Sequence, residues 1–333
     1  MKAIVYTEYG APEVLHLAEA PHPTPQENEI LIRVRAASVS FGDLLARNFG
    51  NISAGEFNMP APLYFLARVA FGWSKPRQPI LGSGFAGEVA AVGDAVTRFK
   101  PGDAVFGYRG QQMGTYAEYL VMREDGFVTH KPANLGDAEA AVAPYGGLTA
   151  LTLLRRVNLR PGQRVLINGA SGGIGAALVQ LAKQRGAHVT GVCGTLRLAY
   201  VQALGADEVI DYTKEDFARR GETYDLIVDV LGRSSFDRCR RALTPDGVYF
   251  LVSFKMKAVM QMLWTKAAGR QKVICAFSDE KPADLELLRE MIEAGSFTSI
   301  VDRSFAMEHA VEVHRYAESG HKQGPIVISF QRK

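Results

Sequence analysis

The sequence predicts an α/β protein with two domains, a partly open β-barrel and a doubly wound parallel sheet. The chain has 333 residues, about twice the length of a usual domain of roughly 100 to 200 residues. Its first part contains short strands separated by Gly and Pro, as in small barrels. From Gln163 onward, apolar β-branched runs alternate with helical stretches, which is typical of parallel strands joined by helices.

The barrel is predicted from the opening strand around MKAIVYTEYG and from four further short strands. These four are Ile30–Ala37, Gly87–Val92, Asp103–Gly107 and Ala117–Met122. Their shortness and the turns between them favour a partly open β-barrel. An Ala- and Leu-rich stretch, Ala138–Val157, then predicts a helix.

The parallel sheet is predicted from six apolar runs, each followed by a helical or turn segment. The runs are Arg164–Asn168, His188–Val192, Glu208–Ile210, Leu226–Val230, Val248–Val252 and Lys272–Phe277. A helix over Ala283–Ala294 and a strand over Ile326–Phe330 complete the pattern. Periodicity leaves open whether this last strand returns to the first domain.

Composition and charge exclude several classes of protein. Hydrophobic residues make up 47% and charged residues 22% of the chain, which is ordinary for a folded domain. A net charge of +3 from 38 basic and 35 acidic residues gives no reason to expect nucleic-acid binding. The opening residues have no apolar run long enough for a signal peptide, and Cys193, Cys239 and Cys275 have no CxxC spacing. We therefore expect a cytoplasmic protein.

Two apolar stretches need a separate interpretation. Met59–Trp73 contains Arg68 and is shorter than the ~20 apolar residues of a membrane span, so no span is expected. Met256–Trp264, flanked by Lys255 and Lys266, resembles a basic amphipathic helix. A pocket lid or a subunit interface is the simpler interpretation of both stretches, and peripheral membrane contact is the alternative.

A glycine-rich segment follows the first run of the predicted parallel sheet. Asn168–Gly175, NGASGGIG, lies between the strand RVLIN and the helical AALVQLAKQRGA, the context required of a dinucleotide-binding loop. Small residues let the backbone approach a pyrophosphate, and the helix N-terminus attracts its charge. The predicted pyrophosphate contacts are Ser171, Gly172, Gly173 and Ile174, and Gly175 completes the cofactor-binding loop by letting helix and strand pack closely.

The residues after the second run favour NADPH over NADH. NADH-binding proteins usually have an acid at the end of this strand, where it holds the ribose 2'-hydroxyl. Here the segment is GVCGTLRLAY, without a carboxylate. Thr195, Arg197 and Tyr212 instead offer hydroxyls and a cation for a 2'-phosphate, although Arg197 is also explained as a solvated residue.

Further cofactor contacts are predicted where the strands end, because a parallel sheet binds ligands at its carboxyl edge. Lys322, in GHKQG, is interpreted either as a phosphate ligand or as a surface lysine. With Cys193 at the end of the second strand, the predicted set is Cys193, Val230, Leu231, Gly232, Ser253, Phe277 and Lys322.

Several segments together resemble a known family. KAIVYTEYGAPEVL, SFGDLLAR, GSGFAGEVAAVG and NGASGGIGAALVQLAK are similar to the zinc-independent quinone-oxidoreductase branch of the medium-chain dehydrogenase/reductase superfamily, and within it to the chloroplast envelope quinone oxidoreductase homologues. The resemblance implies a GroES-like catalytic domain of residues 1–125 and 279–333 around a Rossmann NADP(H)-binding domain of residues 126–278. It also implies a homodimer.

The resemblance bears on metal and substrate. Zinc-containing relatives have ligands in segments that here read SVSFGD (38–43), GSG (82–84) and APY (143–145), and no Cys or His set can be assembled from these. We therefore expect no metal. Without a Lewis acid, alcohol oxidation is disfavoured, whereas quinones and α,β-unsaturated carbonyl compounds are already electrophilic. The expected reaction is their reduction by NADPH.

The resemblance also implies residues near the reacting groups. It places Asp43 beside substrate and nicotinamide, with Ser40 where many relatives have Asn, and it matches Thr149 to a threonine near the nicotinamide. Asp43 is explained equally well as a helix cap. The proton donor stays open among Tyr64, Tyr108, Tyr145 and water.

Two other functions remain in consideration. One is a dinucleotide-binding, membrane-peripheral or redox-sensing protein with weak turnover, because a fold does not dictate a function. The other is a zinc-free alcohol dehydrogenase.

Overall fold

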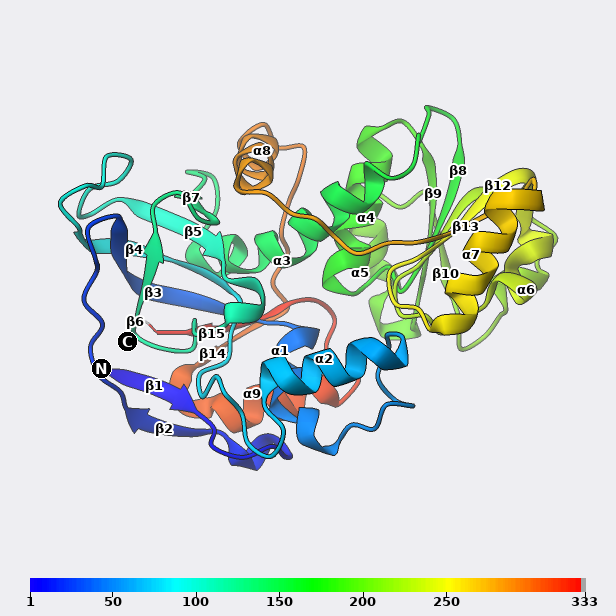
Figure 1. The fold of residues 1–333 in the computed structure, drawn as a ribbon. Coiled ribbons are helices and arrows are strands. Elements are labelled where there is room, and N and C mark those ends of the chain that lie inside the picture. The colour runs from blue at the N-terminus through cyan, green and yellow to red at the C-terminus, as the bar shows by residue number, and fades with distance from the viewer. Residues whose placement is uncertain (331–333) are drawn as a thin grey trace. The chain divides into compact units, whose positions relative to one another are not determined.

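The computed structural model describes residues 1–330, which form two compact units (Figure 1). Unit 1 contains Met1–Ile52, Ala67–Leu148 and the chain from Glu280 onward, and unit 2 contains Ser53–Leu66 and Thr149–Asp279. Two of the four divisions fall inside helices, one in α2 (Ala61–Phe71) and one in α3 (Asp137–Leu154). Each unit is described on its own.

Unit 1 is built on a seven-stranded sheet whose longest strand is β3 (Glu29–Val39). This strand pairs antiparallel with β4, β6 and β15. It carries alternate buried residues such as Ile30, Ile32 and Val34 into the core. The other strands are β4 (Gly84–Val92), β5 (Ala104–Tyr108), β6 (Tyr119–Arg123), β7 (Val128–His130), β14 (Arg303–Ala306) and β15 (Ile326–Ser329).

Smaller elements complete unit 1. A separate antiparallel pair is formed by β1 (Lys2–Val5) and β2 (His16–Glu19). The helices besides α2 and α3 are α1 (Phe41–Arg47), α8 (Pro282–Glu293) and α9 (Ala310–Glu318). Because β15 pairs with β3, the C-terminal strand returns to the first sheet, which the sequence left open.

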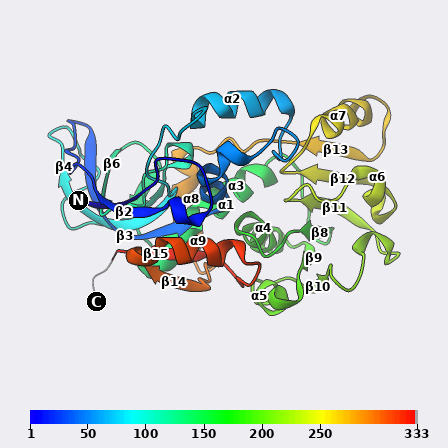
Figure 2. The ribbon, with the colours of Figure 1, turned by 90° about the horizontal axis from the view of Figure 1, so that it is seen from below.

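Unit 2 contains a six-stranded parallel sheet with the order β10-β9-β8-β11-β12-β13, the doubly wound order 3-2-1-4-5-6. After β8 the chain adds β9 and β10 on one side of it, and β11 then pairs with β8 on its other side. The strand order therefore reverses between β8 and β11, and a ligand crevice is expected at the carboxyl ends of these two strands. Figure 2 shows the sheet with its helices. The strands are β8 (Arg164–Asn168), β9 (His188–Cys193), β10 (Glu208–Asp211), β11 (Tyr224–Asp229), β12 (Leu243–Leu251) and β13 (Lys272–Cys275), and the helices are α4 (Gly173–Gln184), α5 (Leu198–Ala203), α6 (Phe236–Cys239) and α7 (Met256–Ala268).

The predicted fold class is confirmed. The limits of the two units differ in two places from the domains of residues 1–125 with 279–333 and of residues 126–278 that the resemblance implies. β7 pairs with β5, which keeps the chain after residue 126 in unit 1 until α3 is under way. Conversely, residues 53–66 group with unit 2, where the Lys255 Nζ donates a hydrogen bond to the Gly55 carbonyl.

Candidate functional site

The glycine loop between β8 and α4 has the shape of a phosphate cradle. Gly169 has a φ of +93°, and a Cβ on Gly175 would lie 2.1 Å from the Gly169 carbonyl oxygen, so the loop and the helix touch through backbone alone. The N-cap of α4 is Gly172. Because glycine has no side chain, no capping hydrogen bond occupies the first N–H groups of the helix. Such a helix N-terminus offers donors and partial positive charge to an anion. These residues therefore fit a dinucleotide pyrophosphate.

Two of the residues predicted to select NADPH lie together at the end of β9. A Cβ on Gly194 would lie 3.6 Å from the Tyr212 hydroxyl and 3.7 Å from an Arg197 guanidinium nitrogen. Tyr212 is exposed, so its phenol is accessible to a ligand at this edge. Thr195, on the same turn, donates its hydroxyl proton to Asp211. Cys193 is buried, and burial raises the pKa of its thiol to about 11, which leaves its backbone as the part that can meet a cofactor.

An aspartate that local sequence reasoning missed organises the carboxyl ends of β8 and β11. Asp229 is fully buried. Its carboxylate accepts hydrogen bonds from the Asn168 side chain (3.1 Å), the Tyr249 hydroxyl (2.9 Å) and the backbone N–H groups of Gly232 (3.1 Å) and Ser234 (2.8 Å). These bonds fix the loop after β11, in which Gly232 has a φ of +63°. The available signal in the sequence was a polar residue at or next to the end of each run, Asn168 in Arg164–Asn168 and Asp229 in Leu226–Val230.

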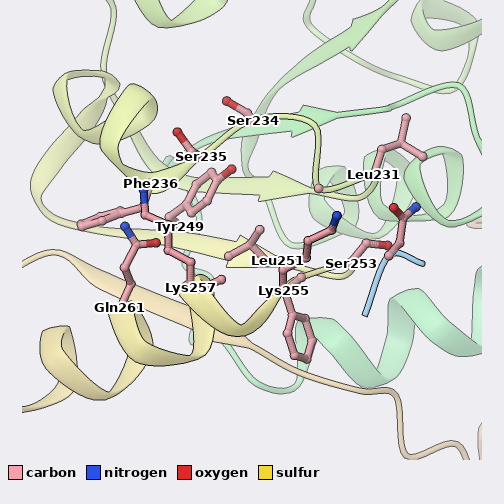
Figure 3. Close-up of a pocket in the computed structure, with 14 residues that line it drawn as sticks. Leu231, Ser234, Ser235, Phe236, Tyr249, Leu251, Ser253, Lys255, Lys257 and Gln261 are labelled. Carbon is pink, nitrogen blue, oxygen red and sulfur yellow. The ribbon is translucent and has the colours of Figure 1, made fainter. Parts of the chain in front are cut away.

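A cavity of about 250 Å³ opens beside this loop (Figure 3). Three predicted cofactor residues, Leu231, Gly232 and Ser253, line it. Phe277, also predicted, packs its ring 5.1 Å from that of the lining residue Phe254, whereas Val230 is buried. The remaining lining residues are Asn58, Ser234, Ser235, Phe236, Tyr249, Leu251, Lys255, Lys257, Ala258 and Gln261.

In unit 1, Asp43 and Ser40 cap the start of α1. The Asp43 Oδ2 accepts from the Ser40 N–H and the Ser40 hydroxyl, both at 2.7 Å, and its Oδ1 accepts from the Gly82 N–H at 2.9 Å. Asp43 is fully buried, and this burial raises the pKa of its carboxyl to about 6. Both oxygens are engaged, so the geometry corresponds to the helix-capping alternative. Ser40 is the N-cap, and Asp43 is the third residue of the helix.

Two tyrosines named as possible proton donors lie near each other in unit 1. The rings of Tyr108 and Tyr145 are 6.4 Å apart. Burial, together with the negative charge of Asp43, raises the pKa of both phenols, that of Tyr145 to about 12, so both stay protonated at neutral pH. The third candidate, Tyr64, belongs to unit 2 and packs edge-on against Phe57 at 5.7 Å.

The segments where relatives carry zinc ligands contain hydroxyl groups here. Ser38 and Ser83 are buried, and their hydroxyls have no hydrogen-bond partner within the described residues. A Cβ on Gly84 would lie 2.6 Å from the Ser38 hydroxyl, so little space separates these residues. Across residues 1–330 no group of three or more His, Cys, Asp or Glu side chains is placed to hold a metal ion. Hydroxyl oxygens do not match the thiolate and imidazole ligands that zinc prefers.

Two predicted cofactor residues lie apart from the glycine loop in the chain. Thr149 is buried in α3, where its carbonyl accepts from the Thr152 hydroxyl at 2.9 Å. Lys322 follows α9 in unit 1. Their contacts to a cofactor remain predictions.

Comparison with known proteins gives matches over nearly the whole chain. Residues 26–133 match the alcohol dehydrogenase GroES-like domain, and residues 204–328 match the family described as zinc-binding dehydrogenase. The chain is 31% identical to the chloroplast quinone oxidoreductase QR1 of Triphysaria versicolor, with 98% of each chain covered. It is 29% identical to the chloroplast NADPH-dependent alkenal/one oxidoreductase of Arabidopsis thaliana, with 98% of this chain and 79% of that protein covered.

A solved structure supports the same relationship. The quinone oxidoreductase of Coxiella burnetii superposes with a TM-score of 0.83 at 29% identity, and 99% of each chain is covered. Among the residues that the structure describes, no helix is long and apolar enough to cross a membrane.

Proposed function

Because the chain belongs to the medium-chain dehydrogenase/reductase superfamily, we propose that it is an NADPH-dependent reductase of quinones or α,β-unsaturated carbonyl compounds. The names of its relatives supply both substrate classes. The observation that carries the proposal is the Gly169–Gly175 loop, whose backbone fits a pyrophosphate. NADPH, when bound, supplies the hydride.

The residues of the chain then bind and orient the cofactor and the substrate. Backbone N–H groups of the segment from Ser171 to Gly175 hold the pyrophosphate, and Arg197 and Tyr212 contact the 2'-phosphate. Asp229 keeps the loop after β11 in one conformation, which fixes one wall of the cavity. In unit 1 the protonated phenol of Tyr108 can donate a hydrogen bond to a carbonyl oxygen.

Zinc independence is part of the proposal. It is supported by the hydroxyl side chains of Ser40, Ser83 and Tyr145 in the segments where relatives carry ligands, and no step is assigned to a metal. Metal analysis of extensively dialysed protein should find well under one zinc per chain. One zinc per chain would overturn zinc independence and, with it, the argument that the chain reduces quinones or enones and does not oxidise alcohols.

The reaction is tested with purified protein, NADPH and a panel of quinones and enones, by following the loss of NADPH absorbance. We expect turnover with members of the panel and little oxidation of ethanol or benzyl alcohol by NADP⁺. Robust alcohol oxidation without any quinone or enone reduction would show that the zinc-free alcohol dehydrogenase alternative is right.

The proposal also covers the oligomeric state and the cellular location of the protein. We propose a homodimer in the cytoplasm that contacts membranes only peripherally. The cytoplasm is supported by Cys193, Cys239 and Cys275, which all have free thiols. Sedimentation equilibrium should give twice the chain mass, and a monomer at micromolar concentration would contradict the dimer.

A further inference from the structure

An acidic side chain lies at the end of β9, although the sequence of that strand contains none there. β10 pairs with β9 in parallel, and the register sets Asp211, the last residue of β10, beside Cys193, the last residue of β9. Asp211 is 6% exposed. The carboxylate that sequence reasoning sought on the second strand of the fold is therefore supplied by the neighbouring strand.

Hydrogen bonds hold this carboxylate in place and keep it charged. One oxygen accepts from the Thr213 N–H at 3.0 Å and the Thr213 hydroxyl at 2.7 Å, and the other accepts from the Thr195 hydroxyl. These bonds lower the pKa of the Asp211 carboxyl, which is therefore ionised at neutral pH. A hydroxyl has a single proton. Thr195, having donated its proton to Asp211, presents only lone pairs to a ligand.

This arrangement treats the two cofactors differently. The ribose 2'-group of a dinucleotide binds at the end of the second strand. A 2'-hydroxyl can donate its proton to Thr195, whereas a 2'-phosphate offers acceptor oxygens and negative charge, which Thr195 and Asp211 disfavour. Arg197 and Tyr212 act in the opposite sense, as does Lys214, whose Nζ lies 3.8 Å from the Asp211 carboxylate.

We propose that Asp211, acting through Thr195, holds the preference of this chain for NADPH over NADH below the level that Arg197 and Tyr212 alone would give. Asp211 is a positioning residue in this role, because Thr195 is the group that meets the ribose. The inference rests on the proposed dinucleotide-dependent function.

The experiment measures binding by calorimetry with two fragments, 2',5'-ADP, which carries the 2'-phosphate, and 5'-AMP, which has a 2'-hydroxyl. Asp211→Asn should raise the affinity for 2',5'-ADP about tenfold, because a nearby negative charge is lost, without raising that for 5'-AMP. Thr195→Val should weaken 5'-AMP several-fold and leave 2',5'-ADP nearly unchanged. Asp246→Asn is the matched control, since it removes a carboxylate that is exposed and paired with Arg270, and it should not change the ratio.

Each outcome decides the inference. An unchanged ratio in Asp211→Asn overturns it, provided that thermal unfolding shows a folded variant. Weaker binding of 2',5'-ADP to Thr195→Val also overturns the inference, because Thr195 would then donate a hydrogen bond to the 2'-phosphate. If Asp211→Asn does not fold, the result with Thr195→Val decides the inference. Wild-type protein that binds neither fragment would overturn the proposed function itself, and the inference with it.

Discussion

Gly175 and Gly172 belong to the same loop but differ in the space around them. A Cβ on Gly175 would lie 2.1 Å from the Gly169 carbonyl oxygen, whereas a Cβ on Gly172 would have its nearest neighbour, the same oxygen, at 3.6 Å. Gly175→Ala must therefore push α4 away from the loop, at a cost of about 2 kcal/mol or more. Gly172→Ala, the same chemical change, should cost about 1 kcal/mol or less.

Urea unfolding of the two variants, with calorimetric binding of NADPH, checks this prediction. Gly175→Ala should lose both stability and most of its NADPH affinity, since the loop that holds the pyrophosphate shifts with the helix. Equal effects of the two substitutions would contradict the assignment of Gly175 as the residue that sets the contact between loop and helix.

Asp43 is predicted to act on stability. In Asp43→Asn the amide nitrogen replaces one acceptor oxygen, so either the Ser40 or the Gly82 N–H faces a second donor inside the core. An unsatisfied buried donor costs roughly 1–3 kcal/mol. Urea unfolding should show a loss of this size, while NADPH affinity stays close to that of the wild type. A stable variant with strongly reduced turnover would restore Asp43 as a residue that orients substrate.

Residues of the site were predictable where the chemistry is local. Arg197 and Tyr212 could be assigned to one edge because each lies within five residues of the end of a predicted strand. The contacts around Gly194 bring them together. Asp211 escaped because its place beside Cys193 depends on the register between two strands. Asp229 escaped for the same reason, since its partners come from β8, β12 and the following loop.

Helices α1 and α9 are joined by a buried charge. Arg47 is 1% exposed and donates to the His314 Nδ1 (3.0 Å), to Glu318 (2.5 Å) and to the Gly10 carbonyl (3.1 Å). His314 is fully buried, and its Nε2 lies 3.4 Å from the Tyr116 hydroxyl. Because the imidazole accepts a bond from Arg47, it must be neutral. Burial and the charge of Arg47 lower the pKa of His314 to about 3.

This depressed pKa gives a pH dependence with a definite sign. The imidazole is neutral in the folded protein down to about pH 3, but it is protonated below about pH 6.5 once the chain unfolds. Its contribution to stability is therefore complete above about pH 6.5 and is lost as the pH falls toward 3. Asp43, whose pKa is raised to about 6, acts in the opposite direction between about pH 6 and pH 4.

The two effects are separated by comparing the wild type with His314→Gln, which keeps a neutral acceptor for Arg47. The advantage of the wild type in unfolding free energy should shrink by about 2 kcal/mol between about pH 7 and about pH 5. Urea titrations at the two pH values measure it, and Asp43 cancels because both proteins contain it. A constant difference would mean that His314 does not titrate on unfolding in this range.

The sequence predicted the architecture of both domains, whereas the structure sets different limits for them. The six apolar runs of the parallel sheet correspond to β8–β13, because buried parallel strands are apolar throughout. The return of β15 to β3 and the grouping of residues 53–66 with unit 2 depend on long-range pairing, which no local pattern encodes. Whether the chain can bind zinc depends on which segments meet in space. The three segments concerned, residues 38–43, 82–84 and 143–145, were identified only through the family resemblance.

The outer surface carries apolar residues that the fold does not bury. On α7, Met256, Met260, Leu263 and Trp264 are 45–66% exposed, and their spacing puts them on one face of the helix. α7 contains no Asp or Glu, and it carries Lys257 and Lys266. Trp264, on the same face of α7, is more than half exposed. Exposed tryptophan with lysine and apolar side chains is typical of a surface that meets an anionic bilayer.

We therefore expect the protein to sediment with vesicles that contain phosphatidylserine and to be released by salt, with a blue shift of tryptophan fluorescence on binding. Leu263→Asp should reduce the bound fraction several-fold, because it places a charge on the apolar face of α7 and opposes the lipid charge. Leu287→Asp, which alters an exposed leucine on α8, is the matched control and should bind as the wild type does. If the wild type does not sediment with these vesicles, and Leu263→Asp instead converts a dimer to a monomer, the face of α7 is a subunit interface.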